Sequence, residues 1–256
     1  MIRRNWTRDE LIIAFNLYCK IPFGKLRSSN KDVIEIASII DRTPNAVALK
    51  LVNFASLDPY HKARGVKGMK NSGKLDKVIY NEFTDNWNKL VYESEILIEK
   101  YKENSKTDIQ NEISEQTTKL EGEEIERLVK TRVNQTFFRK AILANYNSKC
   151  AISNISIPEL LIASHIIPWS LNEVERLNPQ NGICLSPLYD KLFDRGFMSF
   201  TDNYEIIFSE KILKISDENV YNNFFGKYSK QKMTLPEKFT PKVDFIQYHR
   251  NFIFQK

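Results

Sequence analysis

Three residue types that can hydrolyse a phosphate ester follow one another between residues 160 and 200. His165 lies inside an apolar run, Asn181 opens a second apolar run, and Asp190 and Asp194 lie on a short predicted helix. A neutral imidazole can take a proton from water near pH 7, and carboxylate oxygens can hold a hard cation such as Mg²⁺. A base and a cation are what the hydrolysis of a phosphodiester requires.

The same stretch carries a series of short motifs in a fixed order. These are ASHIIPW, NPQNGICL, YD and FDRGFMSF. The series resembles the HNH endonuclease superfamily, in particular its branch of predicted restriction endonucleases. The resemblance implies a ββα-metal site in which His165 is the general base and Asn181 braces the hairpin loop. It further implies that Asp190 binds Mg²⁺ or Mn²⁺.

Two positions depart from the family pattern. Ser164 precedes the base where relatives commonly have Asp or His, and Asp190 follows Tyr189 where some relatives have a His-Asp pair. A hydroxyl is a weak ligand, so we expect Asp190 to hold the ion. Either Asp190 suffices together with Ser164, water and the scissile phosphate, or a carboxylate such as Asp194 is the second protein ligand. Asp194 lies one turn further along the same helix face.

Each of these residues also has a structural interpretation. A histidine in an apolar run can simply be part of the core, and an Asn-Gly pair is by itself a turn signal. Asp194, Arg195 and Gly196 can end a helix through an ion pair and a glycine cap. Trp169 is expected in the core. The order of the motifs favours the catalytic interpretation of His165 and Asn181.

The cysteines do not predict a structural zinc site. Cys150 is followed at the third position by Ser153 instead of a second cysteine, and Cys184 also lacks a CxxC partner. Four ligands of the kind that hold zinc cannot be assembled from this set. With Cys19, the chain has three scattered cysteines, which indicates a reducing compartment and no disulfide framework.

The N-terminal region predicts a helix-turn-helix. Helices are expected over residues 8–20 and 31–40, and a third begins at Pro44 with Thr43 as its N-cap. The motifs WTRDEL, IPFGK and RTPNAVALKLVNF resemble the N-terminal part of the same restriction-endonuclease-like proteins. The third helix would then present Asn45, Lys50 and Asn53 to DNA. A helical packing module without DNA contact is the alternative.

Further basic residues are candidates for contact with phosphates. Residues 61–74 carry five Lys or Arg and three Gly, a composition typical of a basic loop that contacts DNA, here through Arg64 and Lys67. A merely solvated loop is the alternative. Arg139, on a helix predicted from residue 123 to 146, and Arg195 are candidates in the C-terminal half. In the tail, residues 245–254, His249 and Arg250 either clamp a phosphate or merely accompany the packing of their aromatic neighbours.

The expected organisation is an α+β protein of two domains. A helical DNA-recognition domain covers residues 1–91, the end of a helix and an acidic linker cover 92–122, and an HNH nuclease domain covers 123–256. Further expected elements are a helix over 81–101, strands over 158–167 and 183–186, a helix over 187–194, and a hairpin formed by 197–200 and 204–208.

Charge distribution agrees with a polyanionic partner. The chain of 256 residues has a formal net charge of +6, and residues 1–91 contain 16 Lys and Arg against 9 Asp and Glu. Residues 92–127 contain 5 against 11, and residues 128–256 contain 17 against 12. Basic lobes suit nucleic acid. The sequence shows no membrane span and no signal peptide, so we expect a cytoplasmic protein.

The predicted function is therefore a metal-dependent endonuclease that cuts double-stranded DNA, a restriction enzyme that acts on foreign DNA with or without dependence on base modification. Cutting of palindromic sites would imply a homodimer. The alternative is a non-catalytic DNA-binding regulator with a decayed HNH fold. A nuclease of RNA or of single strands is also compatible with the residues.

Overall fold

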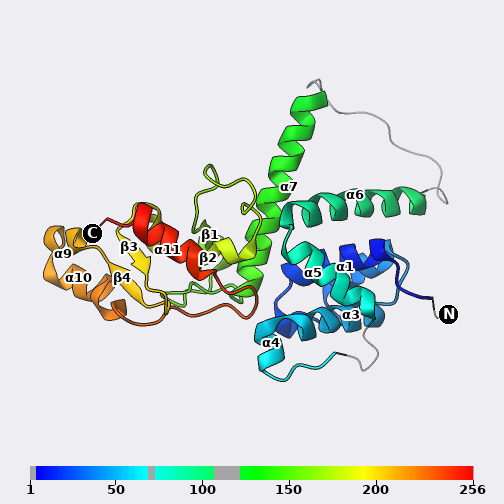
Figure 1. Ribbon diagram of the computed structural model, residues 1–256, viewed down its shortest axis with the longest axis horizontal. Helices are drawn as coiled ribbons and strands as arrows, with labels where there is room; N and C mark the ends of the chain where they lie inside the picture. Colours follow the sequence, from blue (N-terminus) through cyan, green and yellow to red (C-terminus); the bar gives the residue numbers. More distant parts are fainter. Residues whose placement is uncertain (1–3, 69–72, 107–121, 256) are drawn as a thin grey trace. The chain divides into compact units, whose positions relative to one another are not determined.

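The computed structural model describes residues 4–68, 73–106 and 122–255 (Figure 1). The chain divides into two compact units, residues 1–137 (the N-terminal unit) and residues 138–256 (the C-terminal unit). The division falls within helix α7, Gly122–Asn145, instead of at the predicted boundaries 91 and 123. No helix in the described parts of the chain is both long and apolar enough to span a bilayer.

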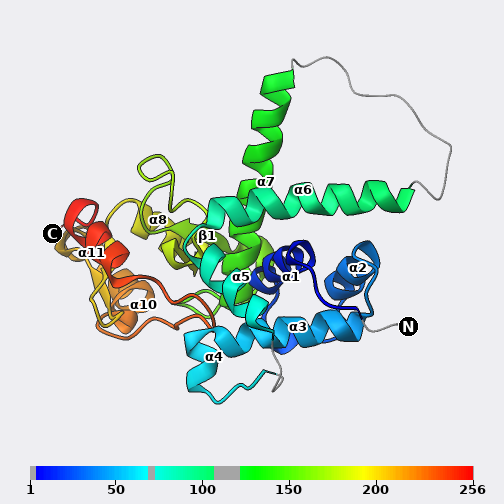
Figure 2. The ribbon, with the colours of Figure 1, turned by 45° about the vertical axis from the view of Figure 1, so that its right-hand side comes forward.

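The described part of the N-terminal unit is helical. Helices α1, α2 and α3 pack against one another, and α5 and α6 pack against α1 (Figure 2). The helices that precede α7 are α1 Arg8–Lys20, α2 Lys31–Ile39, α3 Pro44–Leu57, α4 Pro59–Ala63, α5 Lys74–Thr84 and α6 Trp87–Lys106. The ring of Phe15 lies in the centre of this core, with ring centroids of Phe54 at 5.0 Å and Tyr80 at 5.5 Å.

Local signals place the first three helices where the sequence predicts them. The Thr7 hydroxyl accepts a hydrogen bond from the backbone N–H of Glu10, and the Glu10 carboxylate accepts one from the backbone N–H of Thr7. This reciprocal capping box begins α1. Thr43 caps α3 by accepting a hydrogen bond from the backbone N–H of Ala46, with Pro44 at the first helical position.

The region after α3 differs from the prediction in two respects. The expected loop over residues 61–74 contains part of a short helix, α4, whose N-cap Asp58 accepts from the backbone N–H of Tyr60. The expected helix 81–101 is instead the end of α5 and most of α6. Helix α5 ends before Asp85, and the Asn86 side chain accepts a hydrogen bond from the N–H of Lys89 at the start of α6. The first part of the predicted linker continues α6, and residues 107–121 lie outside the described residues.

The C-terminal unit contains two short hairpins with helices packed against them (Figure 1). Strands β1, Ile162–His165, and β2, Gly182–Leu185, pair antiparallel, as do β3, Met198–Phe200, and β4, Ile206–Phe208. The helices are α8 Pro187–Asp194, α9 Glu210–Ile215, α10 Glu218–Phe224 and α11 Val243–Phe252. Both predicted hairpins are confirmed, although β1 is shorter than residues 158–167, because residues 158–160 form a 3-10 turn.

Helix α11 packs against α8 and β3 through one buried histidine. His249 is 1% exposed, its Nδ1 lies 2.9 Å from the Ser199 hydroxyl, and its Nε2–H donates to the Phe193 carbonyl at 3.0 Å. Its ring is stacked on that of Phe193 with centroids 3.7 Å apart. Packing, and not a phosphate clamp, is therefore the role of His249. Burial lowers its pKa to about 4.

Candidate active site

The β1–β2 hairpin exposes its two faces to different neighbours. His165 is paired with Gly182 and Ser164 with Ile183, so these two pairs lie on opposite faces. A Cβ atom at Gly182 would collide with Phe138 and Ile142 of α7, so α7 covers the face that carries His165. Ser164 lies on the other face, is 3% exposed, and its hydroxyl has no hydrogen-bond partner in the described structure.

His165 lies at the end of β1 and is fixed on two sides. Its ring is stacked on Phe138, with centroids 3.8 Å apart and planes 9° apart, and the edge of Trp169 approaches at 5.5 Å. Its Nε2 lies 3.0 Å from the backbone carbonyl oxygen of Arg176. A carbonyl oxygen can only accept, so Nε2 carries the proton and the neutral ring has its lone pair on Nδ1.

The protein environment keeps His165 in this neutral form. Burial lowers its pKa, and this effect outweighs the opposite effect of the hydrogen bond to the Arg176 carbonyl. At neutral pH the imidazole is therefore a base with a free electron pair at Nδ1. This is the protonation state that a general base needs at the start of hydrolysis.

Asn181 braces the long connection between β1 and β2. It is 1% exposed, and its Oδ1 accepts from the backbone N–H of Ile167 at 2.8 Å. Its Nδ2 donates to the carbonyls of Ile167 and Glu175, both at 3.2 Å. Glu175 immediately precedes Arg176, whose carbonyl binds His165. The amide of Asn181 thus ties the end of β1 to the segment that orients the His165 ring.

Arg176 and Trp169 complete the support of this loop. The Arg176 guanidinium donates through Nε to the Trp169 carbonyl at 2.9 Å and lies over the indole ring at 5.3 Å. Trp169 is only half-buried, so the expectation of a core position is wrong; its side chain lies between His165 and Arg176. Sequence reasoning missed Arg176, because its backbone carbonyl makes the decisive contact and a carbonyl leaves no residue-type signal.

The predicted metal ligands are brought together only in part. Asp190 and Asp194 lie one turn apart on α8. Partial removal from water raises the pKa of Asp194, and the negative charge of Asp190 raises it further. Tyr189, between the hairpin and α10, is buried and donates its hydroxyl to the Phe224 carbonyl. Among the described residues, no three His, Cys, Asp or Glu side chains converge on one point.

One cysteine beside the hairpin, Cys150, forms hydrogen bonds through its sulfur, and a second, Cys184, lies within β2. Cys150 is fully buried, and its sulfur accepts the backbone N–H of Ser186 at 3.2 Å and that of Ser153 at 3.5 Å. Ser186 is the N-cap of α8, so this sulfur helps to fix the start of that helix. Burial, with a smaller effect from Cys150, raises the pKa of Cys184 to about 12.

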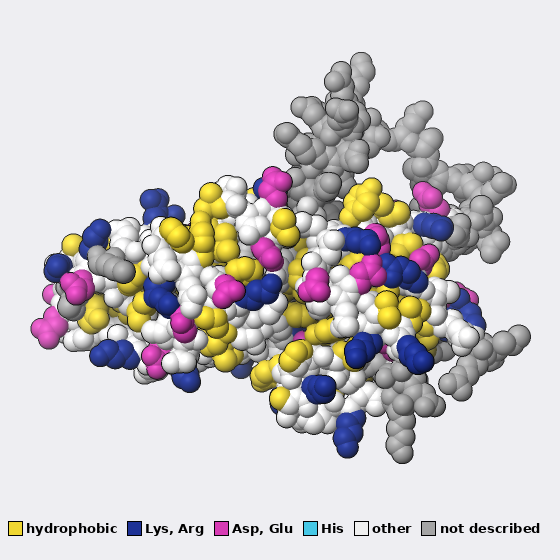
Figure 3. All heavy atoms as spheres, in the orientation of Figure 1, with side chains coloured by type: hydrophobic (Ala, Val, Ile, Leu, Met, Phe, Trp, Pro, Cys, Tyr) yellow, Lys and Arg dark blue, Asp and Glu magenta, His cyan; other side chains and the backbone are white. Residues whose placement is uncertain are grey.

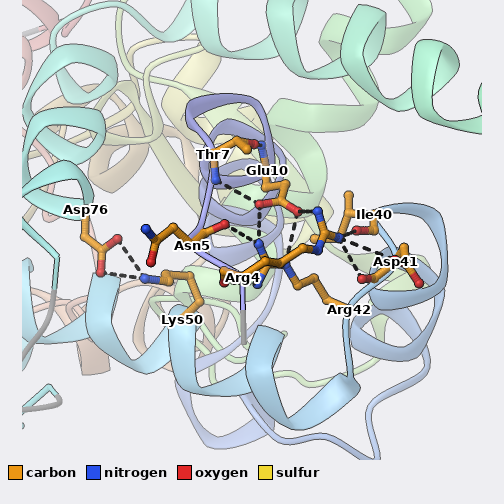
Figure 4. Close-up of polar contacts among 9 residues, drawn as sticks. All are labelled: Arg4, Asn5, Thr7, Glu10, Ile40, Asp41, Arg42, Lys50 and Asp76. Atoms are coloured by element: carbon orange, nitrogen blue, oxygen red, sulfur yellow. Dashed lines mark hydrogen bonds and ion pairs between the residues drawn. The ribbon is translucent and has the colours of Figure 1, made fainter. Parts of the chain in front are cut away.

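Two of the residues expected to contact DNA are instead buried in the N-terminal unit. Lys50 is 8% exposed and Asn53 is 3% exposed. The carboxylate of Asp76 accepts from Lys50 Nζ at 2.9 and 3.0 Å (Figure 4). It also accepts from Asn53 Nδ2 at 3.1 Å. The prediction that α3 presents Lys50 and Asn53 to DNA is therefore wrong, because α5 supplies a buried carboxylate that binds both.

A second buried carboxylate fixes the start of the N-terminal unit. Glu10 is fully buried and accepts from Arg42 at 2.8 Å and from Arg4 at 3.0 Å (Figure 4). The Arg42 guanidinium also lies 4.6 Å from the centre of the Trp6 ring. The WTRDEL and RTP motifs are thus joined by one ion-pair network.

The other candidate DNA contacts are on the surface. Arg139 is exposed, but its guanidinium donates to the carbonyls of Leu161 at 2.6 Å and Pro158 at 3.0 Å, which fixes the approach to β1. The side chains of Asn45, Arg64, Lys67 and Arg195 are exposed. Arg250 donates to Asp202 at 2.6 Å.

Comparison with known families covers the hairpin and α8. Residues 150–201 match the family model of the HNH endonucleases. This segment is an HNH domain. The matched residues include His165, Asn181, Asp190 and Asp194. No curated protein matches the chain. An HNH endonuclease domain suggests nuclease activity on DNA.

Proposed function

We propose that this protein is a metal-dependent endonuclease of double-stranded DNA in which His165 is the general base. The observation that carries the proposal is the fixed tautomer of His165. The Arg176 carbonyl holds the proton on Nε2, burial keeps the ring neutral, and Nδ1 keeps its electron pair. A histidine in this state at the end of the first HNH strand is suited to activate water.

In the proposed reaction, Nδ1 of His165 takes a proton from a water molecule as its oxygen attacks the phosphorus. The bond from phosphorus to O3′ breaks, and O3′ takes a proton from solvent. The products are a 5′-phosphate and a 3′-hydroxyl. Asn181 acts as a positioning residue, because it ties the loop that supplies the Arg176 carbonyl to the end of β1.

The donor groups on α8 suit Mg²⁺ or Mn²⁺ better than zinc. Magnesium is commonly held by one or two carboxylates together with water and substrate phosphate. Asp190 and Asp194 provide two carboxylates whose mutual repulsion a cation would relieve, and the unpartnered Ser164 hydroxyl is a further oxygen. Asp190 would hold the ion. When bound, it would neutralise charge on the phosphate and on the leaving oxygen.

The biological role that we propose is restriction of foreign DNA in the cytoplasm. The separate N-terminal unit, whose residues 1–91 carry 16 Lys and Arg against 9 Asp and Glu, supports a division between DNA binding and cleavage. Such a division suits an enzyme that selects a site or a modified base and cuts with a common catalytic domain. Cutting of both strands at a palindromic site would require two copies of the chain.

A non-catalytic DNA-binding regulator is the second candidate. The observation that favours it is Ser164, a hydroxyl in the position where a stronger metal ligand is expected, in a region whose described residues form no cluster of three strong donors. Such a protein would bind DNA with or without divalent cations and would not cut it.

Cleavage of modified and unmodified plasmid DNA by the purified chain tests the proposal. The reactions contain Mg²⁺, Mn²⁺ or EDTA, and the His165→Ala variant is compared with Ser170→Ala, a change of an exposed residue in the same loop. We expect cleavage that needs the cation, survives in Ser170→Ala and is lost in His165→Ala. Cleavage by His165→Ala at the rate of the unaltered protein would refute the role of His165. DNA binding without cleavage under any cation would establish the regulator instead.

A further inference from the structure

The N-terminal unit carries a surface of exposed basic side chains. It is formed by two segments, residues 23–27 and 60–67, and we call it the basic face. Its five exposed cationic side chains are Lys25, Arg27, Lys62, Arg64 and Lys67. On the side of the molecule seen in Figure 3, dark blue Lys and Arg side chains stand out over the part of this unit where α4 lies.

Aromatic contacts hold the two segments of the basic face together. The Phe23 ring is stacked on that of His61, with centroids 4.1 Å apart. The Arg64 guanidinium lies 5.4 Å from the centre of the Tyr60 ring and 6.0 Å from that of Phe23. Segments that are more than thirty residues apart in the chain therefore form one surface.

The charge of the basic face is uncompensated. None of its five cations forms a salt bridge within the described structure, whereas Arg8, Arg42, Lys50 and Lys89 all pair with carboxylates. Neither segment contains Asp or Glu. Asp58, which precedes α4, is 1% exposed and caps that helix. The first exposed carboxylate after Arg27, Asp32, belongs to α2.

We propose that the basic face binds the backbone phosphates of duplex DNA and is the main electrostatic contact of the N-terminal unit. This inference deepens the proposed function and rests on it for the choice of DNA as the polyanion. Five cations without carboxylate partners attract phosphates independently of base sequence. The face replaces α3 as the expected contact, because Lys50 and Asn53 are bound to Asp76.

Salt dependence of binding provides the test, because each phosphate contact lowers the slope of log K against log salt by about 0.9. Binding of a labelled duplex of mixed sequence is measured by fluorescence anisotropy in EDTA at several salt concentrations. The variants are Lys25→Ala/Arg27→Ala and Lys62→Ala/Lys67→Ala. The control is Lys100→Ala/Lys102→Ala, which removes two charges from α6, one at an exposed position and one at a half-buried position beside Glu99.

We expect both basic-face variants to bind more weakly and to lose about 1.8 from the magnitude of the slope, with the control close to the unaltered chain. Slopes equal to that of the control would overturn the proposal, and so would stronger binding of an RNA duplex of the same sequence. The test is independent of cleavage: a reduced slope without nuclease activity refutes the enzyme and keeps the basic face. Active cleavage with an unchanged slope keeps the enzyme and refutes the basic face.

Discussion

A single methyl group at Gly182 should disturb both the packing of the HNH domain and the position of His165. An alanine Cβ there would lie 2.7 Å from Cζ of Phe138 and 2.8 Å from Cγ1 of Ile142, and closer still to Cδ1 of the same isoleucine. Carbon atoms are in favourable contact at about 3.5–4.0 Å, so these side chains would have to move by roughly 1 Å. Both are buried, at 3% and 0% exposure.

Two effects of Gly182→Ala follow from this crowding. Overpacking of a closed core costs about 1–3 kcal/mol, which should appear as a lower urea midpoint for the C-terminal unit. Phe138 is also the residue on which the His165 ring is stacked, so its displacement moves the base. A misplacement of about 1 Å can lower a reaction rate by about 10²-fold. We therefore expect cleavage to fall by more than the loss of stability explains.

The assay compares Gly182→Ala with two further variants. Gly73→Ala is the matched control, because a Cβ at Gly73 makes only ordinary contacts, at 3.9 Å. Gly182→Ala/Ile142→Ala removes two of the three clashing atoms and should recover part of the lost cleavage, a coupling that a double-mutant cycle measures. Unchanged stability and full activity of Gly182→Ala would show that α7 does not cover this face of the hairpin.

Three other predictions concern buried charges and the metal ligands. Asp76→Ala should destabilise the N-terminal unit by about 3–5 kcal/mol, because it leaves Lys50 buried without its carboxylate partner. Urea unfolding measures this loss. Full recovery of stability should require a second substitution, Lys50→Met. His249, whose pKa is about 4 in the folded protein and about 6.5 when unfolded, should make the C-terminal unit less stable as the pH falls from about 6.5 to about 4, by up to about 3 kcal/mol; thermal unfolding that is as pH-dependent in His249→Gln would contradict this. Asp190→Asn should raise the Mg²⁺ concentration needed for cleavage far more than Asp194→Asn does, and equal effects in a metal titration would show that the two carboxylates share the ion.

Local signals explain why much of the fold can be predicted from the sequence. The capping box of Thr7 and Glu10, the Thr43-Pro44 start of α3 and the β1–β2 hairpin all depend on residues close together in the chain. Their side-chain chemistry and spacing decide the local backbone. The approximate position of His165 and the bracing role of Asn181 follow from the same kind of short motif.

What the sequence does not disclose depends on partners far along the chain. Lys50 is polar and lies on an amphipathic helix, but the Asp76 carboxylate to which its buried ammonium group donates is 26 residues away in the chain. Arg139 is of the residue type that commonly contacts DNA, yet its guanidinium donates hydrogen bonds to the carbonyls of residues 158 and 161. Any residue can supply a carbonyl, as Arg176 does for His165, so no motif marks these contacts.

The three cysteines give each unit a natural reporter of its own opening. Cys19 lies in the core of the N-terminal unit, Cys150 lies beside the β1–β2 hairpin and Cys184 lies within β2; each of the three thiols is fully buried. A thiol reagent can reach them only when the surrounding structure opens. The rates at which the reagent labels Cys19 and the hairpin pair therefore measure the opening of the two units separately, without an introduced probe. DNA added to the same experiment should slow the labelling of whichever unit it holds closed.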